Sequence, residues 1–336
     1  MKDNHLNSVA LDTPFTIGTV PVRNRLVLAP MSGVTDLPFR QLAFRFGAGL
    51  VVTEMVASRE LVFNAAESWS RLKGAGLTPH MVQLAGRDAR WLAEAAVIAE
   101  ANGADIIDIN MGCPAKKVIG GYAGSALMRE PDHALSLIEA TVKAVNIPVT
   151  VKMRLGWDER SINAPEIAAR AESAGVQLIT VHGRTRMQFY EGKADWAAIA
   201  AVREAIRIPL IANGDVETVE DAHEILRLSG ADAVMVGRGC QGRPWHAGVL
   251  AGHAGPKPSE IPSLVIEHYQ MMLEHYGMDV GIRHARKHLG WYLDRHAPAL
   301  DRETKAAIMT SKDAVLVVEA LQQALSGEPR ARQEAA

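Results

Sequence analysis

The chain has 336 residues, of which 48% are hydrophobic and 22% charged, an ordinary composition for a globular enzyme with a sizeable core. Its two cysteines, Cys113 and Cys240, exclude a disulfide framework and a Cys/His metal site and favour a reducing, cytoplasmic location. The absence of a secretory signal and of a long apolar run predicts no membrane contact, and the net charge of −2 decides nothing about RNA, because a neutral protein can carry a local basic patch.

In chain order, a loose polar start over residues 1–12 precedes an expected hairpin with strands at 15–17 and 20–22, which could plug the bottom of a barrel. Eight short apolar runs follow as strands, at residues 25–29, 50–53, 81–84, 105–110, 149–152, 178–182, 210–213 and 233–236. Helical patterns lie between them, at residues 37–46, 88–102, 132–145, 164–174, 196–205 and 219–228.

The spacing of these strands is typical of a βα repeat, and eight such units predict an α/β protein built as a (β/α)8 TIM barrel. A doubly wound sheet is the alternative, but no G-x-G-x-x-G follows the first strand. Gly103, Gly175 and Gly230 each follow a predicted helix, which is typical of a helix C-cap before the next strand.

The pattern changes after Pro244. A stretch rich in Gly and Pro over residues 251–262 indicates a linker that closes a barrel domain over residues 1–250. Three helical stretches then predict a C-terminal helical bundle domain over residues 263–325, with helices at 263–276, 280–296 and 301–325. A polar tail over residues 326–336 is expected to be disordered.

Polar residues gather where the predicted strands end, which in a parallel barrel is the face that carries the chemistry. Each alone could be a turn or capping residue, but their convergence on one mouth favours a site: Gln83, Asn110, Lys152, His182 and Asn213. A lysine at the end of an inward-facing strand requires an anion, and the N1/O2 edge of a reduced flavin would supply one, with Gln83 at the pyrimidine edge.

The loops after the last two strands, Asn213-Gly214-Asp215 and Gly237-Arg238-Gly239, combine glycines with an arginine. Barrels commonly bind phosphate at this position, through backbone N–H groups and helix N-termini, so the ligand is expected to carry a phosphate. The alternative, that these glycines serve only as turns, stays open.

Cys113 lies in the stretch 108–117, where a buried strand runs into a tight loop with two lysines, Lys116 and Lys117. A cysteine at such a strand end can act as a nucleophile, a metal ligand or an acid, or it can be a small buried hydrophobe. Cys240, beside the predicted phosphate loop, is expected to serve packing.

Together these motifs resemble the tRNA dihydrouridine synthase family, most closely its bacterial B-type branch. The resemblance covers nearly the whole chain, through Ala29-Pro-Met-Ser-Gly-Val-Thr-Asp36, Gln83-Leu-Ala-Gly86, Asn110-Met-Gly-Cys-Pro114, Lys152-Met-Arg-Leu-Gly156, His182-Gly-Arg-Thr185, Asn213-Gly-Asp215 and Gly237-Arg-Gly239.

This resemblance implies a flavin-dependent oxidoreductase that reduces a D-loop uridine of tRNA. NADPH would be the reductant, hydride would pass from flavin N5 to uracil C6, and Cys113 would protonate C5 as a general acid. His182 would lie near the isoalloxazine ring. FMN would be held by Ala29, Pro30, Met31, Gln83, Lys152, Asn213, Gly214, Asp215, Gly237 and Arg238.

The resemblance also implies that the helical domain helps to recognise tRNA. Arg283, Arg286 and Lys287 precede Trp291 and Tyr292 on one predicted helix, a grouping compatible with phosphate contact and base stacking. The same spacing could instead put Trp291 in the bundle core with the basic residues on a solvated face. Near the mouth, the expected RNA contacts are Arg154, Arg184 and Arg186.

Two competing functions share part of this pattern. An FMN barrel acting on a small molecule would explain the phosphate site and Lys152, but not the added helices or the arginines at the mouth. A tRNA-binding chaperone would not require Cys113 and Lys152. The sequence does not identify the uridine, and a monomer is the default expectation.

Overall fold

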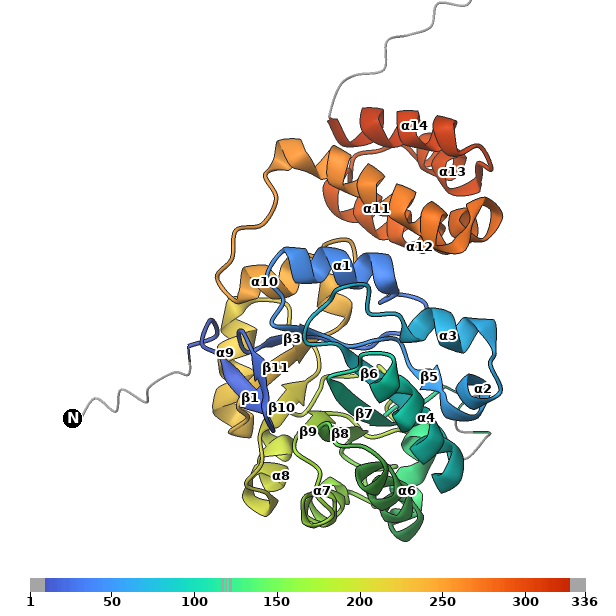
Figure 1. Cartoon of the computed structure of the whole chain (residues 1–336). Coiled ribbons are helices and arrows are strands. Elements are labelled where there is room, and N and C mark those ends of the chain that lie inside the picture. The colour runs from blue at the N-terminus through green and yellow to red at the C-terminus, as the bar shows by residue number, and fades with distance from the viewer. Residues whose placement is uncertain (1–9, 116–117, 119, 121–122, 327–336) are drawn as a thin grey trace, which may run out of the picture.

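The computed structural model describes residues 10–115, 118, 120 and 123–326. These residues form a barrel surrounded by helices, with a further group of helices stacked against one side of it (Figure 1). Most of the expected loose start, most of the expected disordered tail, Lys116 and Lys117 lie outside the described residues. Within the start, Leu11 is buried against the barrel core, so this end of the segment is packed rather than loose.

The expected hairpin is present as antiparallel strands β1 (Phe15–Ile17) and β2 (Val20–Val22). Ile17 and Val22 are fully buried, and they share a hydrophobic cluster with Ile106 and Leu178, which lie at the start of barrel strands. The hairpin therefore closes the bottom of the barrel, as predicted, and leaves the opposite end open for a site.

The barrel strands are all parallel to their neighbours, in the order β4-β3-β11-β10-β9-β8-β7-β6-β5. A bridge between Val52 and Met81 joins the two ends of this order, so the sheet closes. The predicted barrel is thus confirmed, and the doubly wound alternative is wrong. The strands are β3 (Leu26–Leu28), β4 (Leu50–Val51), β5 (Val56–Ala57), β6 (Met81–Ala85), β7 (Ile106–Met111), β8 (Val149–Arg154), β9 (Ile179–His182), β10 (Leu210–Asn213) and β11 (Ala233–Val236).

The second barrel strand differs from its prediction because it is interrupted. β4 and β5 are its two halves, and the segment 53–55 between them leaves regular pairing. The interruption turns the buried carboxylate of Glu54 toward the loop after β3, where it accepts a hydrogen bond from the N–H of Gly33.

The six predicted barrel helices are present as α1 (Leu37–Arg45), α4 (Ala89–Ala101), α6 (Pro131–Ala144), α7 (Ala164–Ser173), α8 (Ala200–Ala205) and α9 (Val219–Ser229). Their ends follow the expected chemistry. Asp36 and Asp88 cap α1 and α4, and Gly103, Gly175 and Gly230 adopt positive φ after α4, α7 and α9. Among the described residues, three short α-helices were not predicted: α2 (Ser58–Val62), α3 (Ala66–Leu72) and α10 (His246–Leu250).

The C-terminal helices are α11 (Ile261–Tyr276), α12 (Met278–His296), α13 (Arg302–Thr310) and α14 (Ala314–Ser326). The stretch 301–325, expected as one helix, is two helices, because Asp313 accepts hydrogen bonds from the N–H groups of Val315 and Leu316 and starts α14 afresh. A single turn at Pro258–Glu260 lies within the expected linker.

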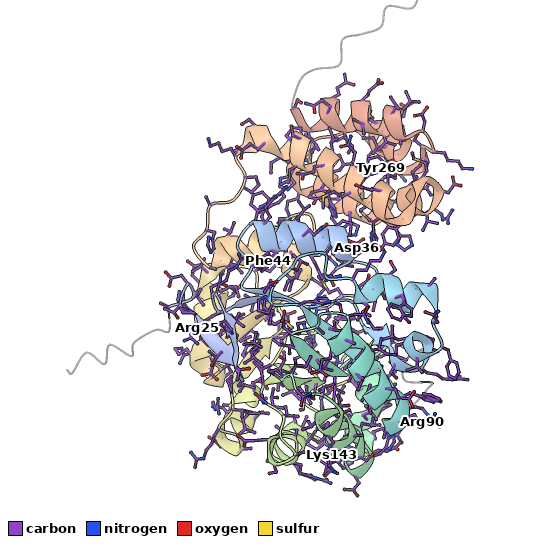
Figure 2. All side chains as sticks on the ribbon, viewed as in Figure 1. Arg25, Asp36, Phe44, Arg90, Lys143 and Tyr269 are labelled. Carbon is purple, nitrogen blue, oxygen red and sulfur yellow. The ribbon has the colours of Figure 1, made fainter. Side chains whose placement is uncertain are left out.

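The C-terminal helices share a hydrophobic cluster with the barrel. Leu42 of α1 and Trp245 pack with Tyr269, Leu289 and Tyr292. Figure 2 shows Tyr269 among the C-terminal helices and Asp36 on the barrel side of the junction. Among the described residues, no helix has the length and apolar character needed to cross a membrane.

Candidate active site

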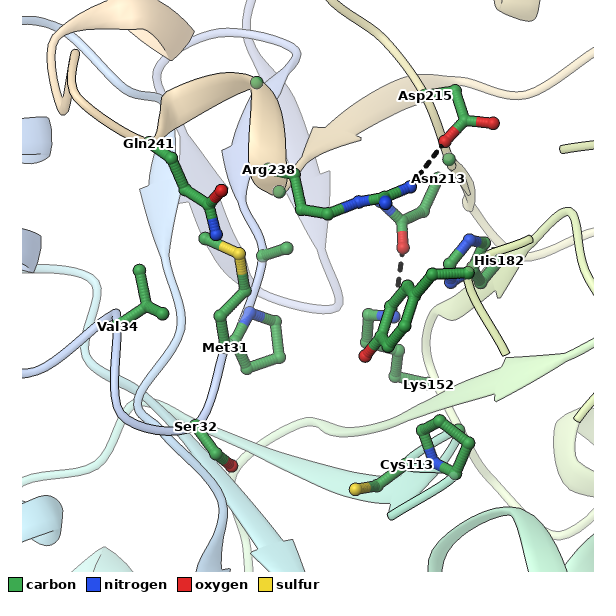
Figure 3. A pocket seen from close by; sticks show the side chains of 18 of the residues that line it. Met31, Ser32, Val34, Cys113, Lys152, His182, Asn213, Asp215, Arg238 and Gln241 are labelled. Atoms are coloured by element: carbon green, nitrogen blue, oxygen red, sulfur yellow. Dashed lines mark hydrogen bonds and ion pairs between the residues drawn. The ribbon is translucent and has the colours of Figure 1, made fainter. Parts of the chain in front are cut away.

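A cavity of about 1060 Å³ lies at the C-terminal ends of the barrel strands (Figure 3). It is at the upper limit of the range of about 300–1,000 Å³ common for ligand pockets. The structure brings to its wall all the residues expected to bind the cofactor or to act as acid: Ala29, Pro30, Met31, Gln83, Cys113, Lys152, His182, Asn213, Gly214, Asp215, Gly237 and Arg238.

A buried amide network holds the loop that carries Cys113. Gln83 Nε2 donates to Asp108 at 2.7 Å, and Gln83 Oε1 accepts from Asn110 Nδ2 at 2.7 Å. Asn110 Oδ1 accepts from the N–H groups of Gly112 and Cys113 at 3.2 and 3.0 Å. Burial raises the pKa of Asp108, and Thr150 donates to its other oxygen at 2.6 Å. The position of the thiol is therefore set by side chains on three adjacent strands.

The Cys113 side chain points into the cavity (Figure 3). Burial raises the pKa of its thiol from the ordinary value of 9.0, against the weaker opposing effects of the Ala115 N–H, Arg154 and Lys152. The thiol is therefore neutral at pH 7, a state in which it can donate a proton and is a poor nucleophile.

Lys152 is a cation in the cavity wall that has no carboxylate partner within ion-pair distance among the described residues. Its Nζ donates to Asn213 Oδ1 at 3.1 Å, and Asn213 Nδ2 is held by the carbonyl of Met235 at 2.8 Å. Burial, together with the positive charge of Arg154, lowers the pKa of Lys152 to about 8. An unpaired cation in such a place favours an anionic ligand.

His182 is neutral, because burial and then the nearby charge of Lys152 lower its pKa well below 6.5. Its Nε2 lies 3.2 Å from Nη1 of Arg184. Since a guanidinium can only donate, Nε2 accepts, and the ring proton is on Nδ1.

Arg184 does not face the solvent. Its guanidinium is buried in a bidentate ion pair with Asp215 and also donates to the carbonyls of Glu191 and Gly192. This corrects the expectation that Arg184 contacts RNA. Burial alone would raise the pKa of Asp215, but the bonds from Arg184 and the Ala194 N–H and the charge of Arg238 lower it. Arg238 donates to the same carboxylate at 2.9 Å.

Arg154 and Arg186 are also largely buried, at 1% and 8% exposure. Arg154 lines the cavity and joins two loops, since it donates to Gly112 O at 2.9 Å and to Phe189 O at 2.8 Å. Arg186 lies over the rings of Trp157 and Phe189 and does not line the cavity.

The basic and aromatic residues predicted to act together on α12 lie in different places in the structure. Arg283 is exposed, Arg286 donates to Thr310 O at 3.3 Å, and neither they nor Lys287 line the cavity. Trp291 does line the cavity and packs against the barrel core, so the alternative that it lies in the bundle core is wrong. Tyr292 is the residue in that core.

Sequence reasoning gave no role to Tyr190, which lines the mouth with 53% of its surface exposed. The guanidinium groups of Arg154 and Arg238 lie over its ring, 5.5 and 5.1 Å from the ring centroid. No sequence signal marks it, because it stands in a loop and its neighbours come from two other strands. Cys240 is fully buried, and burial raises its pKa to about 12, in keeping with a packing role.

Residues 27–327 match the family model described as dihydrouridine synthase. The chain is 74% identical over 315 residues to a probable tRNA-dihydrouridine synthase of Rhizobium leguminosarum bv. phaseoli, covering 94% of this chain and 99% of that relative. It is 44% identical over 315 residues to tRNA-dihydrouridine synthase B of Vibrio vulnificus, covering 91% of this chain and 97% of that relative.

Solved structures of reductases share the fold at low sequence identity. Morphinone reductase superposes with a TM-score of 0.54 at 15% identity, covering 77% of this chain and 94% of that one. A 2-naphthoyl-CoA reductase superposes with a TM-score of 0.58 at 13% identity, covering 73% of this chain and 52% of that one. At these identities the likeness concerns the barrel fold alone.

Proposed function

The chain belongs to the dihydrouridine synthase family, and we propose that it reduces the C5–C6 double bond of a D-loop uridine in tRNA, with FMN as its cofactor and NADPH as reductant. The observation that carries this proposal is the placement of a neutral thiol, Cys113, and an unpaired cation, Lys152, on the wall of one large cavity. The cation would meet the negative charge of a reduced flavin, and the neutral thiol would give a proton to the nucleobase.

The donor set fits a flavin. Lys152 would face the N1/O2 edge, where negative charge gathers in the reduced ring. Gln83 already makes two internal bonds, so one N–H of its amide remains for the pyrimidine edge. Ala29, Pro30 and Met31 would support the ring along the first strand's end.

The other end of the cavity fits the phosphate of FMN. Gly214 has φ +130°, a conformation that L side chains rarely adopt, and a Cβ there would come within 2.6 Å of Ala194 Cβ. Asn213, Gly214 and Asp215 with Gly237 and Arg238 would hold the ribityl phosphate, in part through backbone N–H groups.

Bound and reduced FMN would supply the hydride for C6 of the uracil. Cys113 would donate its proton to C5, and its raised pKa keeps that proton available at neutral pH. Asn110 and Arg154 hold the backbone of the cysteine loop, so that the thiol points into the cavity, where the base would enter. Neutral His182 would lie beside the isoalloxazine without competing for charge with Lys152.

A uridine must leave its stack to reach this cavity. Arg154 lines the cavity and would act on the uridine through the two loops that it joins, and Arg186 would act at the rim. Arg283, Arg286 and Lys287 on α12 would grip the tRNA backbone outside the cavity. The tRNA substrate and the two free thiols support action in the cytoplasm, and a monomer stays the default expectation.

The deciding experiment is anaerobic. The flavin of the purified protein is reduced with NADPH, unmodified tRNA transcript is added, and flavin reoxidation is followed together with dihydrouridine formation. We expect both to occur with matching stoichiometry, and sequencing of the product should map the modified position to the D-loop.

A flavin that is reduced by NADPH but not reoxidised by unmodified or natively modified tRNA would favour a small-molecule substrate. A protein that binds tRNA but no flavin would favour the chaperone function and overturn the proposal.

A further inference from the structure

We propose that Arg295, which comes from α12 and not from the barrel, completes the phosphate site of the cofactor. This inference rests on the proposed FMN function and adds to it a residue that the sequence did not indicate. It makes the C-terminal helices part of the flavin site and not only a surface for RNA.

The cavity wall includes side chains of the last turns of α12. Trp291, Asp294 and Arg295 line it together with Glu217 and Gly239, which belong to the loops after β10 and β11. These two loops are where the phosphate of the cofactor is expected. The charge of Arg295 also acts on Cys240 and Arg243, which follow β11, so the arginine stands on the side of the cavity where the loop after β11 lies.

The charges already present at this end leave a phosphate incompletely neutralised. Arg238 and Arg184 share the single carboxylate of Asp215, so the three groups carry a net charge of about +1 (Figure 3 shows the Arg238–Asp215 pair). A phosphate monoester carries about −1.5 to −2 at neutral pH. Neutralising the phosphate therefore requires a further cation that is not already in an ion pair with a carboxylate.

Arg295 meets that requirement. Its side chain is exposed and makes no hydrogen bond or ion pair with any residue that the structure describes. The neighbouring carboxylate, Asp294, is taken by Lys305. Arg243 lies close enough that the charge of Arg295, after burial, lowers the pKa of Arg243. Arg243 itself lies 3.9 Å from the carboxylate of Glu217, so of these two arginines only Arg295 has no acid paired with it among the described residues.

The end of α12 packs against the segment that follows the loop Gly237-Arg238-Gly239, and this contact positions the backbone of Arg295. His296 Nε2 donates to Gly242 O at 2.9 Å, and Trp245 lies against the ring of His296 at 5.6 Å. Gly242 has φ +70°, and a Cβ there would come within 2.6 Å of Trp291 O. The loop and the helix therefore lie in direct contact, and the backbone that carries Arg295 is held against the segment that follows Gly239.

A basic residue in the last turn of a helix also complements the helix dipole, so a purely structural role is the alternative. The two roles separate when the phosphate is removed from the ligand instead of from the protein. Riboflavin has the same ring and ribityl chain as FMN but no phosphate.

The test measures dissociation constants of the apoprotein for FMN and for riboflavin by quenching of flavin fluorescence. For Arg295→Ala we expect FMN affinity to fall about 10-fold while riboflavin affinity stays within about twofold. Arg295→Lys should recover part of the loss, because it keeps the charge without the planar fork. Arg302→Ala, which removes an exposed arginine of α13 outside the cavity, is the matched control and should behave as wild type.

An equal loss for both flavins would show a structural role and overturn the inference, as would unchanged affinity for both. If FMN affinity is unchanged while tRNA affinity falls, Arg295 serves the RNA backbone instead. In all these cases the wild-type protein still prefers FMN to riboflavin. A wild-type protein without that preference would instead overturn the proposed FMN site itself.

Discussion

Single arginine side chains fix the loops that shape the cavity. Arg184 is 1% exposed and joins Asp215 to the carbonyls of Glu191 and Gly192, so one guanidinium satisfies groups from two strand ends. A buried cation with so many partners has a structural role, because removing it takes two hydrogen bonds from Asp215 and leaves two carbonyls inside the protein without their donor.

Arg184→Met should lower the free energy of unfolding by about 3–5 kcal/mol, because the Asp215 carboxylate and two carbonyls lose a donor inside the protein. Urea denaturation measures it, and Arg160→Met, at an exposed position, should change stability by less than about 0.5 kcal/mol. Unchanged stability with weakened tRNA binding would restore an RNA-binding role for Arg184.

Cys113→Ala should reduce dihydrouridine formation by about 10²–10⁴-fold, the usual contribution of a general acid. Reduction of the flavin by NADPH and the affinity for tRNA should persist, because the thiol makes no contact that holds the cavity together. Single-turnover assays with prereduced protein separate these steps. Cys240→Ala removes the other, fully buried thiol and should keep product formation, whereas normal product from Cys113→Ala would rule out the acid role.

At the scale of elements, α1 connects the loop after β3 to the C-terminal helices. Asp36 caps α1 by accepting from the N–H of Phe39 at 3.0 Å, and its other oxygen accepts from Tyr276 Oη of α11 at 3.1 Å. Burial raises the pKa of Asp36 to about 7, and the charge of Glu54 adds to this against the bonds from Phe39 and Tyr276. One carboxyl thus serves the helix start and the helix–helix junction.

The pKa of Asp36 predicts a pH dependence of stability. Between its unfolded value of about 3.9 and its folded value of about 7, the folded state binds more protons, so the contribution of Asp36 to stability falls as pH rises through this window and is constant above it. Asp36→Asn removes this contribution. The free energy of unfolding of the variant minus that of wild type should therefore rise by about a few kcal/mol as the pH rises from 5 to 8, a size that follows from the pKa shift of Asp36.

Denaturation of both proteins at several pH values checks this prediction. Tyr276→Phe is the companion variant, which keeps the cap but loses the bond from α11. A difference between Asp36→Asn and wild type that does not change with pH would show that Asp36 does not titrate in this range.

At the scale of the whole molecule, the barrel and the C-terminal helices share one hydrophobic cluster. Leu42 and Trp245 of the barrel pack with Tyr269 and Tyr292, whereas the ion pair between Arg45 and Glu267 that also spans the junction is solvent-exposed. Exposed pairs contribute little, so the apolar contact dominates this junction.

Leu42→Ala should therefore destabilise the whole chain by about 2–5 kcal/mol and shift a single thermal transition to lower temperature. Calorimetry measures both the shift and the number of transitions. Leu316→Ala, at a side chain that is 57% exposed, should leave the transition within the error of wild type. Two separate transitions, with only one moved, would show that the helices unfold independently of the barrel.

The sequence by itself determined the barrel, because its strands and helices have local periods, and α1, α4 and α9 have local caps, that do not depend on distant residues. It also predicted which side chains meet at the mouth, since parallel strands place all their C-terminal ends together. Its errors were local interruptions. The break at 53–55 and the restart of α14 at Asp313 follow from hydrogen bonds that a periodicity of apolar residues does not reveal.

Only the tertiary structure decided which of the charged residues are free to meet a ligand. In the sequence Arg184, Arg238 and Arg295 are equivalent cations. In the fold Arg184 is buried against Asp215, and Arg238 shares that carboxylate. Arg295 lines the cavity without a partner in the described chain. The physical reason is that a charge acts through its neighbours and its burial, and both are set by strands and helices that are far apart in the sequence.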